Sequence, residues 1–177
     1  MTSILPFERD HDVVVVGSGP GGEGAAMRAA KAGASGVIVE RPRQVGGGCT
    51  HWATIPSKAL RQAVQSVVEF RRDPLFASLS EGARFTFPQL LRKAEGVIGK
   101  QVAMRRDFYL RNHVTVVHGR ASFADEHTVE VEAAGGPRRA LSARQVVLGT
   151  GSRPHRPPAG GLPPPRPVDS DPILTPH

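Results

Sequence analysis

The hydrophobic pattern starts with four consecutive valines, Val13–Val16, which predict a buried strand of a parallel sheet. A glycine-rich stretch follows and leads into small residues over Gly22–Ala32, a predicted helix that ends at Gly33. The next apolar run, Val37–Glu40, predicts a second parallel strand. The first 40 residues therefore predict a strand–helix–strand unit.

Helical periodicity continues in the middle of the chain. Apolar residues between 60 and 68 share one face of a predicted helix that ends at 71–74, and 75–87 is predicted as a loop. A long amphipathic helix is predicted over 88–112. Strand patterns then follow at Val114–Val117, Ala121–Phe123, Thr128–Val131, Ala140–Leu141 and Val146–Leu148. We expect one more parallel strand, an antiparallel meander and a final buried strand.

A length of 177 residues and a hydrophobic content of 39% fit one soluble α/β domain. We expect a lead-in over 1–12, a Rossmann-like domain over 13–152 and a proline-rich linker over 153–177. No apolar run is long enough to span a bilayer, and the first 12 residues lack the layout of a secretion signal. These features favour a cytoplasmic protein with no membrane partner.

The formal net charge of +7 raises the question of nucleic-acid binding. The arginines are spread over polar positions of the predicted helices and over the tail, and no basic run is interleaved with aromatic residues. We therefore expect no nucleic-acid partner. His113, His118 and His127 lack the spacing of metal ligands, so no metal site is expected.

The glycines after the first strand have the spacing of a dinucleotide-binding turn. Gly17, Gly19 and Gly22 form G-x-G-x-x-G between a predicted strand and a predicted helix. They permit a tight turn, the approach of a pyrophosphate and close helix–strand packing, respectively. Glu40 ends the second strand, where a carboxylate can accept hydrogen bonds from a ribose. The alternative is a plain turn with a surface acid, and the order of the elements favours the dinucleotide site.

Four further motifs follow in order: Val39-Glu40, Gly46-Gly47-Gly48-Cys49, Ile55-Pro56-Ser57-Lys58 and Gly149-Thr150-Gly151-Ser152-Arg153-Pro154. Together with the glycine turn they resemble the FAD-dependent pyridine nucleotide–disulfide oxidoreductases over nearly the whole chain. The resemblance implies a Rossmann-like FAD-binding domain, FAD as cofactor and NAD(P)H as substrates. It also implies small-molecule dinucleotides as partners and, for full-length members, homo-oligomers.

The same resemblance assigns roles to individual residues. Cofactor binding is expected at Gly17, Gly19, Gly21, Gly22, Glu40, Arg41, Gly47, Gly48, Cys49, Thr50, Lys58, Gly119, Ala121, Thr150 and Gly151. Cys49 and Lys58 are the catalytic candidates, with Lys58 expected near the N5–O4 edge of the flavin. For Lys58 the alternative is an ordinary surface lysine. For Cys49 the alternative to a thiolate beside the flavin is a small packed residue.

Most family members carry a second cysteine five residues after the first, and the two form a redox disulfide. This sequence has a single cysteine and places Thr54 at that position, so a dithiol relay is absent. The segment from Gly46 to Leu60 resembles one branch of the family, the soluble pyridine nucleotide transhydrogenases. That branch implies hydride transfer from NADPH to NAD⁺ by way of the flavin. The alternatives are a non-catalytic FAD-binding fragment and a disulfide-reductase-like flavoprotein that has lost its second cysteine.

Family members continue into an NAD(P)-binding domain with its own glycine motif, a second FAD segment and a dimer-interface domain. No second glycine motif of this kind follows within the 177 residues. We therefore expect the chain to correspond to the amino-terminal portion of such an enzyme. We also expect it to be inactive by itself and to retain FAD weakly.

Overall fold

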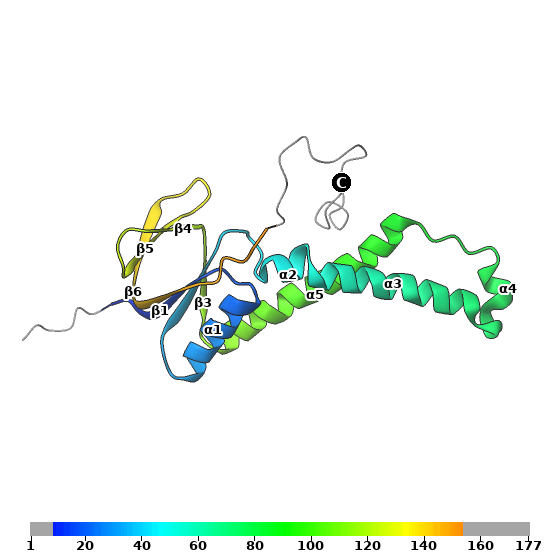
Figure 1. Cartoon of the computed structure of the whole chain (residues 1–177), viewed down its shortest axis with the longest axis horizontal. Helices are drawn as coiled ribbons and strands as arrows, with labels where there is room; N and C mark the ends of the chain where they lie inside the picture. The colour runs from blue at the N-terminus through cyan, green and yellow to red at the C-terminus, as the bar shows by residue number, and fades with distance from the viewer. Residues whose placement is uncertain (1–8, 154–177) are drawn as a thin grey trace, which may run out of the picture. The chain divides into compact units, whose positions relative to one another are not determined.

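The structure is a computed structural model that describes residues 9–153 (Figure 1). These residues form two compact units. The sheet unit contains the described residues up to 47 together with 104–151, and the helical unit contains 48–103 with 152–153. The predicted lead-in lies partly, and the predicted proline-rich linker almost wholly, outside the described residues.

One six-stranded sheet forms the sheet unit, with the strand order β3-β2-β1-β6-β5-β4. The strands are β1 (His11–Val16), β2 (Gly36–Glu40), β3 (Thr115–His118), β4 (Arg120–Phe123), β5 (Thr128–Glu132) and β6 (Arg138–Leu148). Strands β3, β2, β1 and the second half of β6 run parallel, while β6, β5 and β4 are antiparallel neighbours. This mixed sheet confirms the predicted Rossmann-like α/β architecture with its meander.

The two last predicted strands, at 140–141 and 146–148, are one continuous strand in the structure. The first half of β6 pairs with β5, for example Leu141 with Val129. Its second half pairs with β1, for example Val146 with Val14. The mostly polar residues 142–145 predict a break between the two runs. The strand continues through them because Ser142 still pairs with β5, and the next residue, the fully buried Ala143, already pairs with β1.

The apolar core of the sheet unit lies between the parallel strands and the meander. Val14, Val37 and Val39 on the parallel strands are fully or almost fully buried with Val129 and Leu141 on the meander. Because strand side chains alternate between faces, Val15 and Ile38 point to the opposite face, and both are fully buried as well. Burial on both faces explains why β1 and β2 read as unbroken apolar runs.

Helix α1 (Pro20–Lys31) connects β1 to β2 and contacts both strands. Gly22 is buried in its first turn, and a Cβ atom there would collide with the carbonyl oxygen of Gly17. At the other end, Gly33 adopts a φ of 79°, and its N–H donates to the Ala30 carbonyl at 3.0 Å. The N–H of Ala34 reaches back to Ala29 at 3.1 Å, which completes the glycine-ended helix that the sequence predicts.

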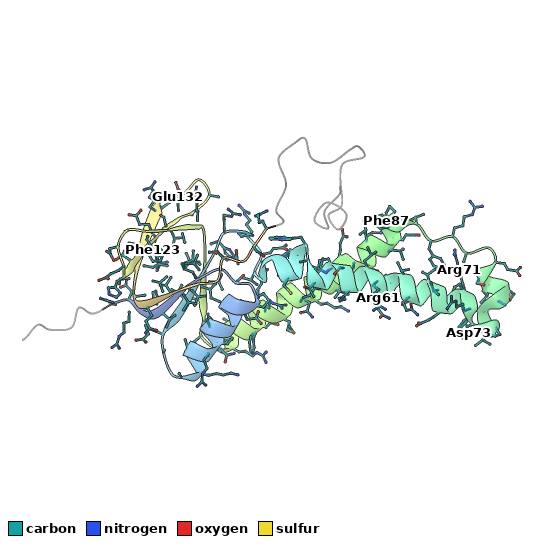
Figure 2. All side chains as sticks on the ribbon, viewed as in Figure 1. Arg61, Arg71, Asp73, Phe87, Phe123 and Glu132 are labelled. Atoms are coloured by element: carbon teal, nitrogen blue, oxygen red, sulfur yellow. The ribbon has the colours of Figure 1, made fainter. Side chains whose placement is uncertain are left out.

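Helices form the second unit. They are α2 (Gly47–His51), α3 (Thr54–Arg72), the 3₁₀ turn η1 (Pro74–Phe76), α4 (Ala77–Ser80) and α5 (Phe87–Arg111), whose last turns belong to the sheet unit. The predicted loop over 75–87 therefore contains two short helical segments. Asp73 caps the first of them, η1, by accepting a hydrogen bond from the Leu75 N–H at 2.9 Å. The arginines of α3, such as Arg61 and Arg71, are exposed (Figure 2).

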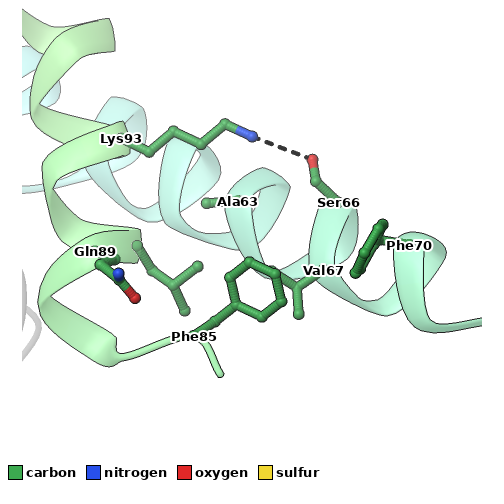
Figure 3. Close-up of a pocket in the computed structure, with 8 residues that line it drawn as sticks. Ala63, Ser66, Val67, Phe70, Phe85, Gln89 and Lys93 are labelled. Carbon is green, nitrogen blue, oxygen red and sulfur yellow. Dashed lines mark hydrogen bonds between the residues drawn. The ribbon is translucent and has the colours of Figure 1, made fainter. Parts of the chain in front are cut away.

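A groove of about 420 Å³ lies between α3 and the first turns of α5 (Figure 3). Ala63 and Val67 line it from α3, and Lys93 donates across it to the Ser66 hydroxyl at 3.4 Å. Phe85 closes one end and meets the ring of Phe70 edge-on, with 6.1 Å between ring centroids. In the described part of the chain, none of the helices combines the length and apolarity needed to cross a membrane.

The packing of α1 generates a test with two adjacent glycines. Gly22→Ala places a methyl group against the Gly17 carbonyl, so we expect it to lower the free energy of unfolding by about 1–3 kcal/mol. Gly21→Ala is the matched control, since a Cβ there meets nothing within 4 Å. Urea unfolding followed by circular dichroism measures both changes. Equal losses for the two variants would contradict the role of residue 22.

Candidate functional site

The glycine turn lies where the chain leaves the carboxyl end of β1. Gly17 has a φ of 103°, and a Cβ atom there would collide with the carbonyl oxygen of Gly149. The N–H of Gly17 donates to Val39 on one side, and the N–H of Gly149 donates to Val16 on the other, both at 2.8 Å. Hydrogen bonds thus fix the turn between the ends of the two strands that flank β1.

This position is the switch point of the sheet. Strand β1 continues through α1 to β2 on one side, while β6 lies on its other side. In open α/β sheets, ligands bind at such a switch point, outside the carboxyl ends of the strands. Thr150 and Gly151, both exposed, follow β6 at this edge, and Gly151 has a φ of 73°.

The first turn of α1 presents unpaired backbone donors at this edge. Its N-cap, Gly19, provides no side-chain cap. The N–H groups of Gly21 and Gly22 have no acceptor within the described chain. With the partial positive charge of the helix end, such groups form a site for an anion like a pyrophosphate.

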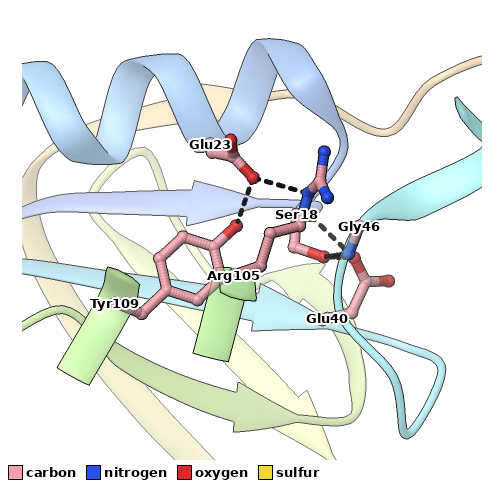
Figure 4. A network of polar contacts seen from close by, with 6 residues as sticks. All are labelled: Ser18, Glu23, Glu40, Gly46, Arg105 and Tyr109. Atoms are coloured by element: carbon pink, nitrogen blue, oxygen red, sulfur yellow. Dashed lines mark hydrogen bonds and ion pairs between the residues drawn. The ribbon is translucent and has the colours of Figure 1, made fainter. Parts of the chain in front are cut away.

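Glu40 is 6% exposed, and its carboxylate points back to the glycine turn (Figure 4). Ser18, which is fully buried, donates both its N–H at 2.7 Å and its hydroxyl at 2.5 Å to Glu40 Oε2. The Oε1 atom has no partner in residues 9–153. The predicted ribose-binding carboxylate is therefore fixed at the carboxyl end of β2 with one oxygen uncommitted.

The loop after β2 approaches the turn closely. Gly47 has a φ of 58°, and a Cβ atom there would lie 2.7 Å from the Gly19 Cα. The glycine-rich stretch predicts a close approach, and the partner in the structure is the backbone of the turn itself. Arg41, at the start of this loop, is exposed.

Gly119 directly follows β3, the strand that pairs with β2, and Ala121 lies in β4. The N–H of Gly119 donates to the Glu40 carbonyl at 3.0 Å, so only its carbonyl is left for a ligand. A Cβ atom at Gly119 would lie 2.6 Å from Val131 Cγ1, which explains why this position carries glycine. Ala121 is half-buried in β4 and pairs with Val131.

The remaining predicted residues belong to the helical unit. Gly48 and Cys49 lie in α2 and are half-buried, and a Cβ atom at Gly48 would meet the Trp52 indole nitrogen at 2.8 Å. Thr50 is fully buried, and its hydroxyl has no hydrogen-bond partner in the described chain. Lys58 is exposed in the first turns of α3.

Sequence reasoning missed an ion-paired network at the first turn of α1. Glu23, in the first turn, accepts from Arg105 Nε at 2.9 Å and from the hydroxyl of Tyr109 at 3.3 Å (Figure 4). Arg105 and Tyr109 come from the end of α5 and are 9% and 2% exposed. The pairing places a positive charge beside the acid in the first turn of α1. An isolated arginine on a helix gives no signal of a partner more than 80 residues away.

No cluster of three His, Cys, Asp or Glu side chains suited to a metal ion occurs between residues 9 and 153.

Comparison with known proteins decides the family. The family described as pyridine nucleotide-disulphide oxidoreductase matches residues 11–172. The chain belongs to this family. The same fold is present in a solved structure, the HOCl-induced flavoprotein disulfide reductase RclA from Escherichia coli. The two structures superimpose with a TM-score of 0.72 and share 22% sequence identity. The match covers 93% of this chain and 34% of RclA.

Curated relatives within the family carry the description soluble pyridine nucleotide transhydrogenase. One from Pseudomonas fluorescens is 52% identical over 166 residues, which is 94% of this chain and 36% of the relative. One from Escherichia coli is 47% identical over 173 residues, which is 98% of this chain and 37% of the relative. The chain thus spans just over a third of the length of these family members.

The Glu23 network generates a test by pH titration. Burial, followed by the charge of Glu23, raises the pKa of the Tyr109 phenol above its usual value of 10.0. Because Tyr109 is the only tyrosine, tyrosinate absorbance reports on this group alone. We expect the native chain to titrate at higher pH than the chain unfolded in urea.

A raised pKa means that the folded state holds the proton more tightly, so this contribution to stability is complete below pH 10.0 and is lost as the pH rises toward the folded pKa. Tyr109→Phe should remove this alkaline loss. Coincident titration curves for the native and unfolded chains would contradict the burial of the phenol.

Proposed function

We propose that this chain is the FAD-binding portion of a flavin-dependent pyridine nucleotide transhydrogenase, which transfers hydride from NADPH to NAD⁺. Two observations together support the proposal. The glycine turn and Glu40 lie at one edge of the sheet, where a phosphate and a ribose would fit. The chain is also 47–52% identical to proteins described as soluble pyridine nucleotide transhydrogenases. FAD, when bound, supplies the hydride-accepting and hydride-donating chemistry that protein side chains lack.

The residues of the sheet unit fit the adenosine diphosphate half of FAD. A Cβ atom at Gly47 would lie 2.7 Å from the Gly19 Cα, and Gly19 itself carries no side chain that would keep a pyrophosphate from the backbone. The N–H groups of Gly21 and Gly22 donate to phosphate oxygens, and Glu40 Oε1 accepts from a ribose hydroxyl. In this assignment Gly119 and Ala121 offer backbone groups to the adenine, and Thr150 and Gly151 flank the cofactor.

The residues of the helical unit fit the flavin half. The buried Thr50 hydroxyl without a partner is a polar group that a bound cofactor would satisfy. Gly48 and Cys49 follow the loop that approaches the turn, and they pass along the flavin and its ribityl chain in this assignment. Lys58 supplies a positive charge that stabilises negative charge on the flavin, and Arg41 adds a cation at the end of β2.

A disulfide reductase is the other activity that the fold suggests, because the superimposable RclA is described as one. A relay of that kind needs two sulfur atoms, and this sequence supplies only Cys49. Thr54 begins α3 and carries a hydroxyl that forms no disulfide. Direct exchange between nicotinamides is therefore the activity that these residues support best.

Calorimetry with FAD, ADP and riboflavin tests the cofactor assignment. We expect FAD and ADP to bind and to compete, and riboflavin, which lacks the adenosine and both phosphates, to leave ADP binding unchanged. Glu40→Gln should weaken ADP binding by about tenfold, because a hydrogen bond to a carboxylate contributes more than one to an amide.

Glu130→Gln is the matched control for Glu40→Gln. Glu130 is also a strand carboxylate with a partner, Arg138 at 3.6 Å, but it lies on the meander. Equal losses from the two variants, or competition of riboflavin with ADP, would count against the assignment.

A chimera tests the reaction. Replacing the matching 173 residues of the Escherichia coli relative with this chain should give a protein that transfers hydride from NADPH to thio-NAD⁺. The same protein should not reduce a disulfide such as lipoamide, since the grafted segment carries one cysteine thiol and a disulfide relay needs two. An FAD-loaded chimera that reduces lipoamide, or that transfers no hydride, would refute the transhydrogenase assignment.

A further inference from the structure

Ser18, which lies between two glycines of the turn, makes three hydrogen bonds to residues far from it in the sequence. Its side chain is fully buried, donates to Glu40 Oε2 at 2.5 Å and accepts from the Gly46 N–H at 2.8 Å. Its backbone N–H donates to the same Oε2 atom at 2.7 Å. One residue therefore joins the turn, the end of β2 and the loop that follows β2 (Figure 4).

The two bonds from Ser18 determine how the carboxylate is presented. A carboxylate held by one bond can still rotate about its terminal torsion, whereas two donors on one oxygen restrict that rotation. With Oε2 committed, the Oε1 atom is the acceptor left for a ligand hydroxyl. A preorganised acceptor binds better than one that must be ordered on binding.

The bond to Gly46 extends the effect to the loop. Gly46 is buried, and the next residue, Gly47, packs against the Gly19 backbone. Without the Ser18 hydroxyl, the Gly46 N–H would lose its acceptor in a buried place, which is costly. We assign this bond to the stability of the fold, whereas the bond to Glu40 sets the orientation of the carboxylate.

We propose that Ser18 is a positioning residue for ribose recognition: its hydroxyl orients Glu40 so that Oε1 faces the ribose hydroxyls of the bound dinucleotide. The proposal rests on the proposed FAD site and deepens it. It also separates Ser18, which touches no ligand atom in this scheme, from Glu40, which does.

The test compares ADP with 2′,3′-dideoxy-ADP, measured by calorimetry on the 177-residue chain. We expect the wild type to bind dideoxy-ADP about tenfold more weakly than ADP. Ser18→Ala should weaken ADP binding by about tenfold and leave dideoxy-ADP binding within about twofold, because only a ligand with ribose hydroxyls uses the orientation of Glu40. In a Glu40→Gln background, Ser18→Ala should have little further effect on ADP.

Ser35→Ala is a close control. Ser35 also donates its N–H and its hydroxyl to one carboxylate oxygen, Asp12 Oδ2, each at 2.9 Å, and it directly precedes β2 at the end opposite Glu40. We expect it to change neither affinity. Ser18→Cys, which is only slightly larger and has a weaker hydrogen-bond donor, replaces Ser18→Ala if the alanine variant does not fold.

The outcomes separate the two proposals. Equal weakening of both nucleotides by Ser18→Ala, or no weakening of either, overturns the positioning role while the FAD site stands. Failure of both Ser18 variants to fold also overturns it, since the hydroxyl would then serve the fold and not the ligand. A wild-type chain that binds neither ADP nor FAD refutes the proposed function and this inference together.

Discussion

Helix α1 lies directly on the turn that precedes it because residue 22 has no side chain. A Cβ atom at Gly22 would overlap the carbonyl of Gly17, and one at Gly17 would overlap the carbonyl of Gly149. These contacts bring the start of the helix to the ends of β1 and β6. The backbone segments at residues 17, 22 and 149 lie so close together that a Cβ atom at Gly17 or Gly22 would overlap a neighbouring carbonyl group. The arrangement therefore depends on the absence of side chains at these positions.

The electrostatics of the site follow from this packing. A helix end without a side-chain cap presents free N–H groups toward the carboxyl edge of the sheet. The acid in the first turn would oppose anion binding if it stood alone, but Arg105 pairs with Glu23. At the end of β2 the Glu40 charge is directed by Ser18. The negative charge of Glu40 thus lies where a ribose would bind. The negative charge of Glu23, near the expected phosphate position, is compensated by Arg105.

The parts of the structure that follow local rules could be predicted from the sequence. The unbroken valine runs predict strands buried on both faces, and the spacing of Gly17, Gly19 and Gly22 predicts the turn. The end of α1 at Gly33 also follows from a local rule, since glycine adopts a positive φ readily.

Features that depend on contacts distant in sequence were not predicted. The continuity of β6 arises because two different strands pair with its two halves. Ser18 is one of two non-glycine residues that separate the glycines of the turn, and nothing in its neighbours along the chain indicates a bond to residue 40 or 46. The Arg105 and Tyr109 partners of Glu23 likewise come from a helix far along the chain, and helical periodicity shows only that such residues can be buried.

The most direct measurement of the central claim is an amide chemical-shift titration of the ¹⁵N-labelled chain with ADP. If the glycine turn and the end of β2 hold the adenosine diphosphate half of the cofactor, the largest shifts fall on the backbone amides of residues 17–23 and of residues 40 and 46–47. Amides around the α3–α5 groove should stay unchanged. The largest shifts at that groove, or on the meander away from Gly119, would contradict this account.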